Sequence, residues 1–216
     1  MTAHAVAIKV ADLAPPDSAV EAQCGPCPAT QAMDRYANGD DEAFAALYDA
    51  LAPRLFGFLL RKTADRQLAE DLVQTTMLDI HLARGSYVTG ADVLPWVYAI
   101  ARRLAVDAYR RRRREVLHDT DDLRGDSHFS AEAMLPDECV QQAQASRRLE
   151  VIFEQLPAVQ QATFELVKQD GLSLAQAAQV LGTTIGAVKL RLHRACATLR
   201  AALTTDPVAK PRTQGP

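Results

Sequence analysis

A hydrophobic period of about 3.6 residues runs with few breakers from Asp34 to Arg114, and it returns from about Ala143 to Leu203. Apolar residues at this spacing lie on one face of a helix, so both stretches predict amphipathic helices that bury a shared face. Abundant alanine and leucine also favour helices. We therefore expect an all-α fold with two small helical domains, at residues 34–114 and 143–203.

Three other segments lack this period. Residues 1–33 contain four prolines, at positions 15, 16, 26 and 28, and are expected to form a flexible N-terminal extension. Residues 115–142 are expected to form a flexible linker, because eight acidic residues stand against one arginine between positions 115 and 140. Residues 204–216 are polar and contain proline, which predicts a disordered tail.

The composition limits the class of protein and its compartment. Hydrophobic residues make up 48% and charged residues 24% of the 216 residues, which excludes wholesale disorder. Four cysteines are too few for a disulfide scaffold, so a reducing cytoplasm is expected. No stretch approaches the roughly 18 apolar residues of a membrane span. We expect a cytoplasmic protein without membrane insertion.

Caps and breakers place the helices of the first domain. Asp40 or Asp41 can cap a helix that Pro53 is expected to break or kink. Asp65 can cap a second helix that runs to about position 83. Asp92 can cap a third, which ends in arginines at 110–114 and carries the apolar stripe Trp96, Ile100, Leu104 and Ala108.

The segment at 172–203 carries the strongest local signals. Ser173 and, three residues later, Gln176 form a capping-box pattern that begins a short helix. Gly182 suits the left-handed conformation at the end of that helix, and Thr184 can cap the next one. The expected buried stripe of this second helix is Ile185, Val188, Leu192, Ala195 and Leu199. Two short helices with a glycine turn predict a helix-turn-helix.

The outer face of the second helix is basic. It shows Ala187, Leu190, Arg191 and Arg194, with Lys189 and His193 beside them. A helix of this kind can enter a major groove, where arginine reads guanine edges or binds phosphates. The alternative is an amphipathic helical hairpin whose basic side chains merely face water.

A second basic cluster ends the helix predicted from Asp92. Its seven arginines are Arg102, Arg103, Arg110, Arg111, Arg112, Arg113 and Arg114. Such density is typical of phosphate contacts and predicts salt-dependent binding of nucleic acid. A solvated face that complements the helix C-terminus is the alternative. Tyr87, which lies between two glycines in a predicted loop, can stack on an unpaired base.

Cys24 and Cys27 form a Cys-Gly-Pro-Cys sequence. A thioredoxin-type dithiol needs a preceding buried strand and a following helix, and no apolar strand precedes Cys24. A redox pair or zinc site using these two cysteines is a minority alternative to free thiols. No other nucleophile, base or metal-ligand set stands at a meaningful spacing, so we expect no catalytic activity and no cofactor.

Three segments, in this order, resemble extracytoplasmic-function (ECF) sigma factors of bacterial RNA polymerase. They are AEDLVQTTMLDI at 69–80, WVYAIARRLAVDAYRRRRRE at 96–115 and LSLAQAAQVLGTTIGAVKLRLHRA at 172–195. With the helices between them, the resemblance covers roughly residues 34–203. It implies a helical promoter-melting domain (region 2), a flexible linker and a helix-turn-helix domain (region 4).

The resemblance implies roles for individual residues of the first domain. The residues that would dock on the clamp of the polymerase β′ subunit are Glu70, Asp71, Gln74 and Thr75, with Leu72, Thr76 and Ile80 facing the core. The basic helix would bind and melt the −10 element, with Arg103 where the family usually has asparagine. The loop at 85–94, which contains Tyr87, would capture a flipped-out base.

The resemblance also implies partners. Thr184, Lys189, Arg191 and Arg194 would contact the −35 element, and Leu190 would meet a thymine methyl group or a partner protein. Core RNA polymerase, promoter DNA and an anti-sigma factor are the expected partners. Two alternatives from other classes stay open: a stand-alone helix-turn-helix regulator, and a thiol-responsive or metal-responsive helical interaction module.

Overall fold

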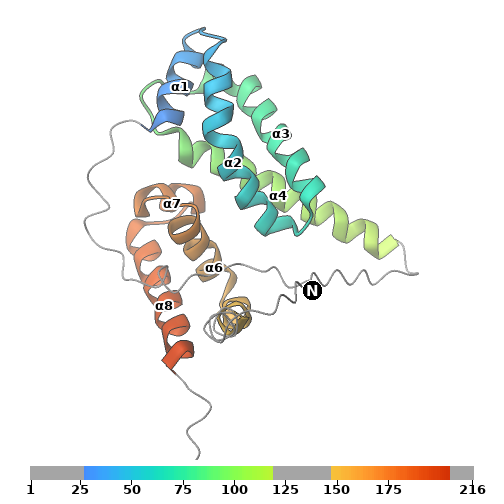
Figure 1. Cartoon of the computed structure of the whole chain (residues 1–216), viewed down its shortest axis with the longest axis vertical. Coiled ribbons are helices and arrows are strands. Elements are labelled where there is room, and N and C mark those ends of the chain that lie inside the picture. Colours follow the sequence, from blue (N-terminus) through green and yellow to red (C-terminus); the bar gives the residue numbers. More distant parts are fainter. Residues whose placement is uncertain (1–26, 119–146, 205–216) are drawn as a thin grey trace, which may run out of the picture.

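The computed structural model describes residues 27–118 and 147–204, and every regular element within these ranges is helical, which confirms the all-α fold. The N-terminal bundle consists of α1 (Pro28–Ala37), α2 (Ala43–Thr63), α3 (Arg66–Ala83), the 3-10 turn η3 (Arg84–Ser86) and α4 (Val93–His118). The C-terminal bundle consists of helical residues 147–155, α6 (Ala158–Phe164), the π-helical turn η4 (Glu165–Gln169), α7 (Leu174–Leu181) and α8 (Ile185–Thr204). Figure 1 shows the two bundles one above the other.

α2 is the central helix of the N-terminal bundle, where it packs against α1, α3 and α4. Its fully buried leucines recur every four residues, at Leu47, Leu51, Leu55 and Leu59. This spacing gives one apolar face, as a core helix requires. Within the described ranges α2 alone has the length and apolarity of a membrane span.

The expected break at Pro53 is wrong, because α2 continues through it from Ala43 to Thr63. A proline inside a helix costs about 3 kcal/mol, since it removes a hydrogen bond and crowds the preceding turn. Leu51 and Leu55 flank Pro53 and are both completely buried. We attribute the intact helix to the packing of this face, which offsets the local cost.

The N-terminal extension expected to reach residue 33 is too long, because α1 begins at Pro28. Proline suits the first position of a helix, where its missing N–H would have no partner. The buried side chains of α1 include Ala29, Ala32, Met33 and Tyr36, which are spaced by three and four residues. This face packs against α2, so burial stabilises a helix that is short for independent stability. Cys24 and the rest of residues 1–26 lie outside the described residues.

Both expected caps in the middle of the N-terminal bundle are present. Asp65 Oδ1 accepts a hydrogen bond of 3.1 Å from the backbone N–H of Leu68 at the start of α3. Asp92 Oδ1 accepts a hydrogen bond of 3.1 Å from the N–H of Leu94 at the start of α4. Each carboxylate satisfies one of the N–H groups that a helix N-terminus leaves without a partner.

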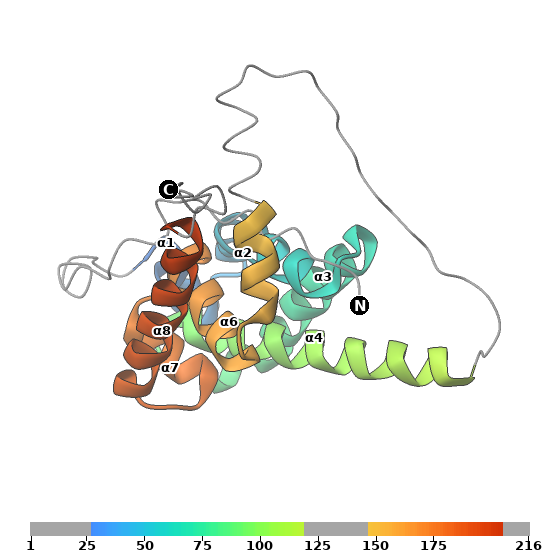
Figure 2. The same cartoon turned by 90° about the horizontal axis from the view of Figure 1, so that it is seen from below.

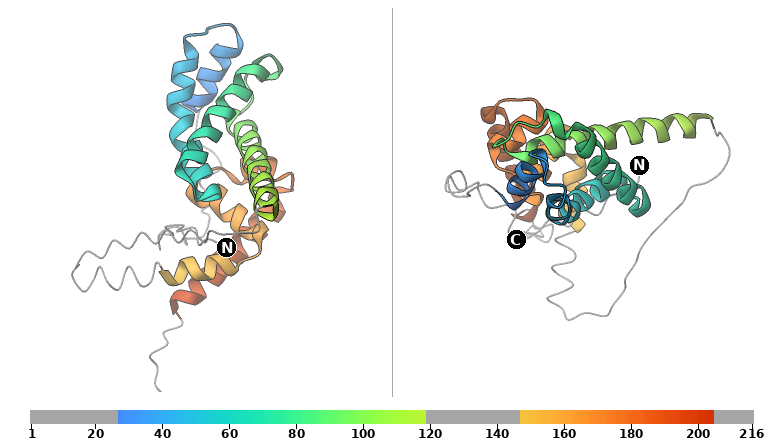
Figure 3. Two further views of the ribbon diagram at one scale, coloured as in Figure 1. Left: turned by 90° about the vertical axis from the view of Figure 1, so that its right-hand side faces the viewer. Right: turned by 90° about the horizontal axis from the view of Figure 1, so that it is seen from above.

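α4 differs from expectation in its stripe and its end. Its buried side chains include Val97, Ala101 and Ala105, whereas the expected stripe of Trp96, Ile100, Leu104 and Ala108 is half-buried at the edge of the core. The helix also runs on to His118, beyond the expected domain end at Arg114. In Figures 2 and 3 this C-terminal part of α4 projects past the other helices. Residues 119–142 of the expected linker lie outside the described ranges.

The helix-turn-helix of the C-terminal bundle has the expected local signals. The N–H of Gln176 donates to Ser173 Oγ (3.1 Å), and the N–H of Ser173 donates to Gln176 Oε1 (2.6 Å), which completes the capping box. Gly182 has a φ of +59° at the end of α7. Thr184 Oγ1 accepts a hydrogen bond of 3.2 Å from the N–H of Ala187 in α8.

The expected buried stripe of α8 is correct except at its first residue. Val188, Leu192, Ala195 and Leu199 are completely buried, whereas Ile185 is 48% exposed. A helical side chain points back towards the preceding turn. Because Ile185 stands in the first turn of α8, the side chain extends past the helix end rather than into the core.

Candidate nucleic-acid and polymerase interfaces

The outer face of α8 carries the residues expected at the −35 element. Thr184, Lys189, Leu190 and Arg194 are exposed, and Ala187 and Arg191 are half-buried. Burial of Val188 and Leu192 fixes this orientation, because the remaining positions must then face outward. The face combines cationic side chains with one large apolar one, Leu190, which is 50% exposed. Guanine edges, phosphates and thymine methyl groups are ligands of this chemistry.

The arginines of α4 are exposed wherever the structure describes their side chains. These are Arg102, Arg103, Arg110, Arg111, Arg112 and Arg114, whereas the side chain of Arg113 lies outside the described residues. Arg103 pairs with Asp79 at 3.1 Å and Arg112 with Asp65 at 3.5 Å. Exposed ion pairs of this kind contribute about 0–1 kcal/mol, so phosphate oxygens can replace the carboxylates at little cost.

The loop between η3 and α4 holds Tyr87 in one position. Its ring packs against Trp96, with 5.7 Å between the ring centroids, and its hydroxyl donates to the carbonyl of Ala91. Burial, together with the nearby Asp34 carboxylate, raises the pKa of Tyr87 to about 12, so the hydroxyl is neutral at pH 7. Asp34 also accepts a hydrogen bond of 2.8 Å from the N–H of Gly90, which has a φ of +84°. The loop therefore presents a fixed aromatic pair.

α3 carries the residues expected to bind the polymerase. Glu70, Asp71, Gln74 and Thr75 are exposed, and Leu72, Thr76 and Ile80 are buried. Thr76 is buried without a penalty because its hydroxyl donates to the carbonyl of Leu72 (2.7 Å). The three buried positions are spaced by four residues, and their packing turns the polar set to one outer face.

Sequence reasoning did not identify a groove that adjoins this polar face. The groove has a volume of about 570 Å³ and is lined by Tyr36, Asp41, Phe44, Tyr48, Gln74, Met77, Leu78, His81 and Arg84. Leu78 is 55% exposed and Tyr48 is 40% exposed. The sequence does contain a sign of this groove, because Leu78 is an apolar residue that does not share the four-residue spacing of the buried positions of α3. Gln74 lies both on the polar face and in the groove, so the two surfaces are continuous.

Only some of the cysteines that could take part in metal or thiol chemistry are among the described residues. Cys27 precedes α1 and is half-buried, Cys196 is buried in α8, and both are free thiols. Burial raises the pKa of Cys196, which disfavours its reactive thiolate form. Within residues 27–118 and 147–204, no group of three or more His, Cys, Asp or Glu side chains could hold a metal ion.

Comparison with known proteins places this chain in a family. Residues 47–115 match the family Sigma-70 region 2, and residues 146–199 match the family Sigma-70, region 4. The chain is 34% identical over 168 residues to the RNA polymerase sigma factor CarQ of Myxococcus xanthus, which covers 78% of this chain and 93% of CarQ. It is 33% identical over 164 residues to the ECF RNA polymerase sigma factor SigF of Caulobacter vibrioides, which covers 76% of this chain and 87% of SigF.

A solved structure has a similar fold. The sigma factor RpoE in complex with the anti-sigma factor NepR from Bartonella quintana matches with a TM-score of 0.56 and 24% sequence identity, over 76% of this chain and 99% of RpoE. The sequence matches favour a sigma factor over a stand-alone helix-turn-helix regulator or a thiol-responsive module, because they span both bundles in one order. The chain belongs to the ECF RNA polymerase sigma factors of the sigma-70 family.

Proposed function

We propose that this sigma factor binds bacterial core RNA polymerase through α3, reads and melts the −10 element with α4 and the Tyr87 loop, and reads the −35 element with α8. One observation supports this assignment above the others. A polar face on α3, an arginine-rich end on α4 and a basic face on α8 are all exposed, and they lie on separate helices. The polymerase and each of the two DNA segments therefore have a separate surface of the chain to bind.

For the polymerase, we assign the contact with the β′ clamp to Glu70, Asp71, Gln74 and Thr75. Carboxylate and amide groups on one helix face suit a basic partner surface. Leu78 and Tyr48 in the adjoining groove would add apolar contact area, which supplies affinity in proportion to the area removed from water. The active site for RNA synthesis belongs to the polymerase, and the sigma factor itself carries out no reaction.

For the −10 element, the assigned residues are Tyr87, Arg102, Arg103, Arg110, Arg111, Arg112, Arg113 and Arg114. Melting a base step costs a few kcal/mol, which the protein must repay by stacking and hydrogen bonding of the released bases. The aromatic pair of Tyr87 and Trp96 suits a stacked base, at about 1–3 kcal/mol per base. The arginines would hold the phosphates of the separated strand.

For the −35 element, the assigned residues are Thr184, Ala187, Lys189, Leu190, Arg191 and Arg194. α8 would lie in the major groove, where Arg191 and Arg194 reach guanine edges or phosphates. An anti-sigma factor is proposed as a further partner, by analogy with the fold shared with RpoE. We place the protein in the cytoplasm, where polymerase and promoter DNA are found.

The proposal is tested by gel filtration of the chain with bacterial core RNA polymerase, followed by run-off transcription from promoter DNA. We expect co-elution of the wild-type chain and loss of co-elution in the Asp71→Arg and Gln74→Arg variants, with unchanged helical circular dichroism. Gln155→Arg is the matched control, because Gln155 is an exposed glutamine on the other bundle. Equal co-elution of the Gln74→Arg and Gln155→Arg variants would contradict the assignment of α3.

A further inference from the structure

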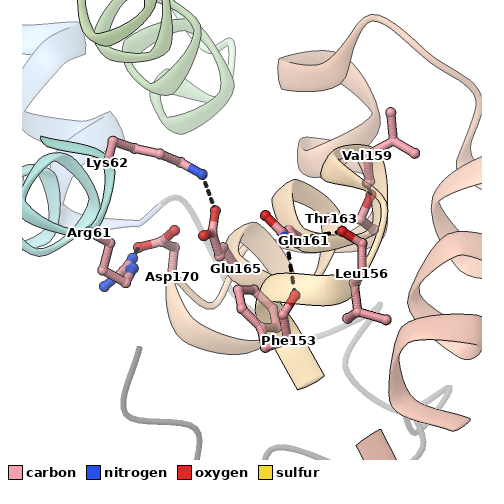
Figure 4. Close-up of polar contacts among 9 residues, drawn as sticks. All are labelled: Arg61, Lys62, Phe153, Leu156, Val159, Gln161, Thr163, Glu165 and Asp170. Carbon is pink, nitrogen blue, oxygen red and sulfur yellow. Dashed lines mark hydrogen bonds and ion pairs between the residues drawn. The ribbon is translucent and has the colours of Figure 1, made fainter. Parts of the chain in front are cut away.

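Charged side chains link the two bundles across α2 and η4. Lys62 pairs with Glu165, and Arg61 pairs with Asp170. Arg54 Nη2 donates a hydrogen bond of 2.7 Å to the backbone carbonyl of Asp170. Figure 4 shows Lys62 and Arg61 extending from α2 towards the two carboxylates. We call these five residues the interdomain clamp.

The carboxylates of the clamp are buried. The side chains of Glu165 and Asp170 are 6% and 4% exposed, whereas those of Lys62 and Arg61 are 31% and 22% exposed. A buried charge is costly unless it is paired and hydrogen-bonded. Both acids belong to the C-terminal bundle and both cationic partners to the N-terminal bundle. The two carboxylates are therefore buried and paired only while the bundles touch.

The π-helical turn η4 places the two acids on one side. In an α-helix, residues five apart are separated by about 500°, which is 140° from a common direction. The wider π turn brings residues five apart nearly into line, and the N–H of Asp170 donates to the carbonyl of Glu165 (2.9 Å). π-helical turns are rare and often occur at functional sites. Here the turn presents Glu165 and Asp170 on the side that faces α2, where they lie opposite Lys62 and Arg61.

A second contact joins the bundles at α4. α7, the first helix of the helix-turn-helix, packs against α4. The side-chain amide of Gln176 in α7 donates to Asp92, the residue that caps α4. The C-terminal bundle thus lies directly beside the start of the helix assigned to the −10 element.

This arrangement is too compact for a promoter. The −35 and −10 elements are by name about 25 base pairs apart, which is roughly 85 Å of B-DNA at 3.4 Å per step. α8 is the longest helix among the described residues of its bundle, and 20 residues span only about 30 Å. A hydrogen bond holds that bundle to Asp92. The −35 face therefore lies within roughly 30 Å of Asp92, and the arginines at the far end of α4 lie within roughly 40 Å of Asp92, so the two surfaces together span less than the promoter spacing.

We propose that the described arrangement is a closed, self-inhibited state of the sigma factor, held by the interdomain clamp, and that the clamp must open before both promoter elements can be bound. This inference rests on the proposed function, since the inhibited activity is simultaneous binding of the two elements. Desolvation of the buried ions offsets much of their attraction. The closed state is therefore only marginally favoured, and polymerase surfaces or promoter DNA can open it.

Charge reversal and charge exchange test the clamp in the full chain. In the Lys62→Glu variant, three carboxylates face one another, and small-angle X-ray scattering of the free chain should show a larger radius of gyration than in the wild type. The exchanged variant Lys62→Glu with Glu165→Lys restores the pair in reverse and should return the radius to the wild-type value. Arg35→Glu is the matched control, because Arg35 forms an exposed ion pair with Asp40 on α1 and should leave the radius unchanged.

Binding of the free chain to a DNA duplex that carries both promoter elements gives the functional measurement. The opened Lys62→Glu variant should bind this duplex about tenfold more tightly than the wild type, and the exchanged variant should bind it like the wild type. An unchanged radius in Lys62→Glu, or an exchanged variant that stays expanded, would overturn the proposal. The scattering experiment uses the free chain, so it tests the interdomain clamp independently of polymerase binding. Co-elution of the wild-type chain with polymerase decides the proposed function separately.

Discussion

Gln176 donates a side-chain hydrogen bond to Asp92, and the same side chain accepts a hydrogen bond of 2.6 Å from the N–H of Ser173. One amide therefore completes the capping box of α7 and links α7 to the cap of α4. The oxygen serves the local structure of the helix-turn-helix, and the nitrogen serves the contact between bundles. Because the two atoms have different roles, they can be separated by substitution.

We predict that Gln176→Glu keeps the capping box and weakens the contact between the bundles. Glutamate is as suitable as glutamine at this position of a capping box. Its second oxygen, however, would face Asp92, and two like charges 4 Å apart repel by about 1 kcal/mol in water and about 4 kcal/mol near a protein surface. Small-angle scattering should show expansion, while the thermal melting of the helices should shift little.

Gln176→Ala is the comparison variant, because it loses both roles. It should expand the chain and also destabilise α7, by about 1 kcal/mol for the lost cap. If Gln176→Glu scatters like the wild type, the link to Asp92 contributes nothing to the closed state. If Gln176→Glu melts like Gln176→Ala, the separation of the two roles is wrong.

We predict that a fall in pH favours the closed state. Burial raises the pKa of Asp170 from 3.8 to about 6, against the opposing effect of Arg61. In an open chain the carboxyl returns to its ordinary pKa, so the closed state binds the proton more tightly. Between about pH 6 and pH 4 the closed state gains stability as the pH falls, by up to roughly 3 kcal/mol at 1.36 kcal/mol per pKa unit. Above about pH 6 the Asp170 carboxyl is ionised in both states, so it no longer makes the balance between them depend on pH.

The prediction is checked by scattering at pH 7.5 and pH 5. The wild-type chain should be more compact at pH 5, and Asp170→Asn should remove this difference. Asp40→Asn is the control, because Asp40 is an acid on the surface, away from the clamp, and the difference should persist. The groups that surround Asp170 are Arg54, Arg61, Lys62, Tyr98 and Glu165. Expansion of the wild-type chain at pH 5 would show that breaking these ion pairs dominates over the cost of burial.

Local signals in the sequence were sufficient for four of the five expected caps. The expected cap of α2 at Asp40 or Asp41 is wrong, because Glu42 precedes this helix and forms no side-chain cap hydrogen bond. The hydrogen bonds of Asp65, Asp92, Thr184 and the capping box of Ser173 all join residues at most three positions apart. Short-range bonds of this kind depend on the nearby residue types alone. The outward-facing positions of α3 and α8 could also be predicted, because the spacing of the apolar residues along each helix shows which side is buried.

Features that depend on another helix could not be predicted from the sequence. The continuity of α2 through Pro53 depends on the packing of its leucine face, and the burial of α1 depends on α2. The clamp was also missed, because Glu165 and Asp170 look like ordinary surface acids until α2 is placed beside them. An acid near residue 165 and a base near residue 61 have no shared period, so only the fold brings them together.

We predict that Leu78→Asp weakens the binding of core polymerase about tenfold or more. Leu78 lines the groove beside Gln74 and is 55% exposed. Burying a leucine at an interface contributes about 1.5–3 kcal/mol, and an aspartate at the same place must also lose its hydration. Leu82→Asp is the matched control, because Leu82 is 72% exposed on α3 and does not line the groove.

Fluorescence anisotropy with labelled sigma factor gives both affinities. Both leucines are exposed, so neither substitution should lower the melting temperature appreciably. Equal loss of affinity in the two variants would assign the effect to the added charge rather than to the groove. Equal affinity of Leu78→Asp and the wild type would remove the groove from the polymerase interface.

We predict that Arg194→Ala weakens binding of −35 DNA by about 1–3 kcal/mol if the guanidinium reads a guanine, with little effect on a scrambled site. If Arg194 instead binds a phosphate, both sites should weaken equally, and the slope of log affinity against log salt should fall by about 0.9. Arg35→Ala is the control, because Arg35 is an exposed arginine on α1 in an ion pair with Asp40. Holoenzyme should be used, since polymerase binding opens the clamp. A loss equal to that of Arg35→Ala would remove Arg194 from the DNA interface.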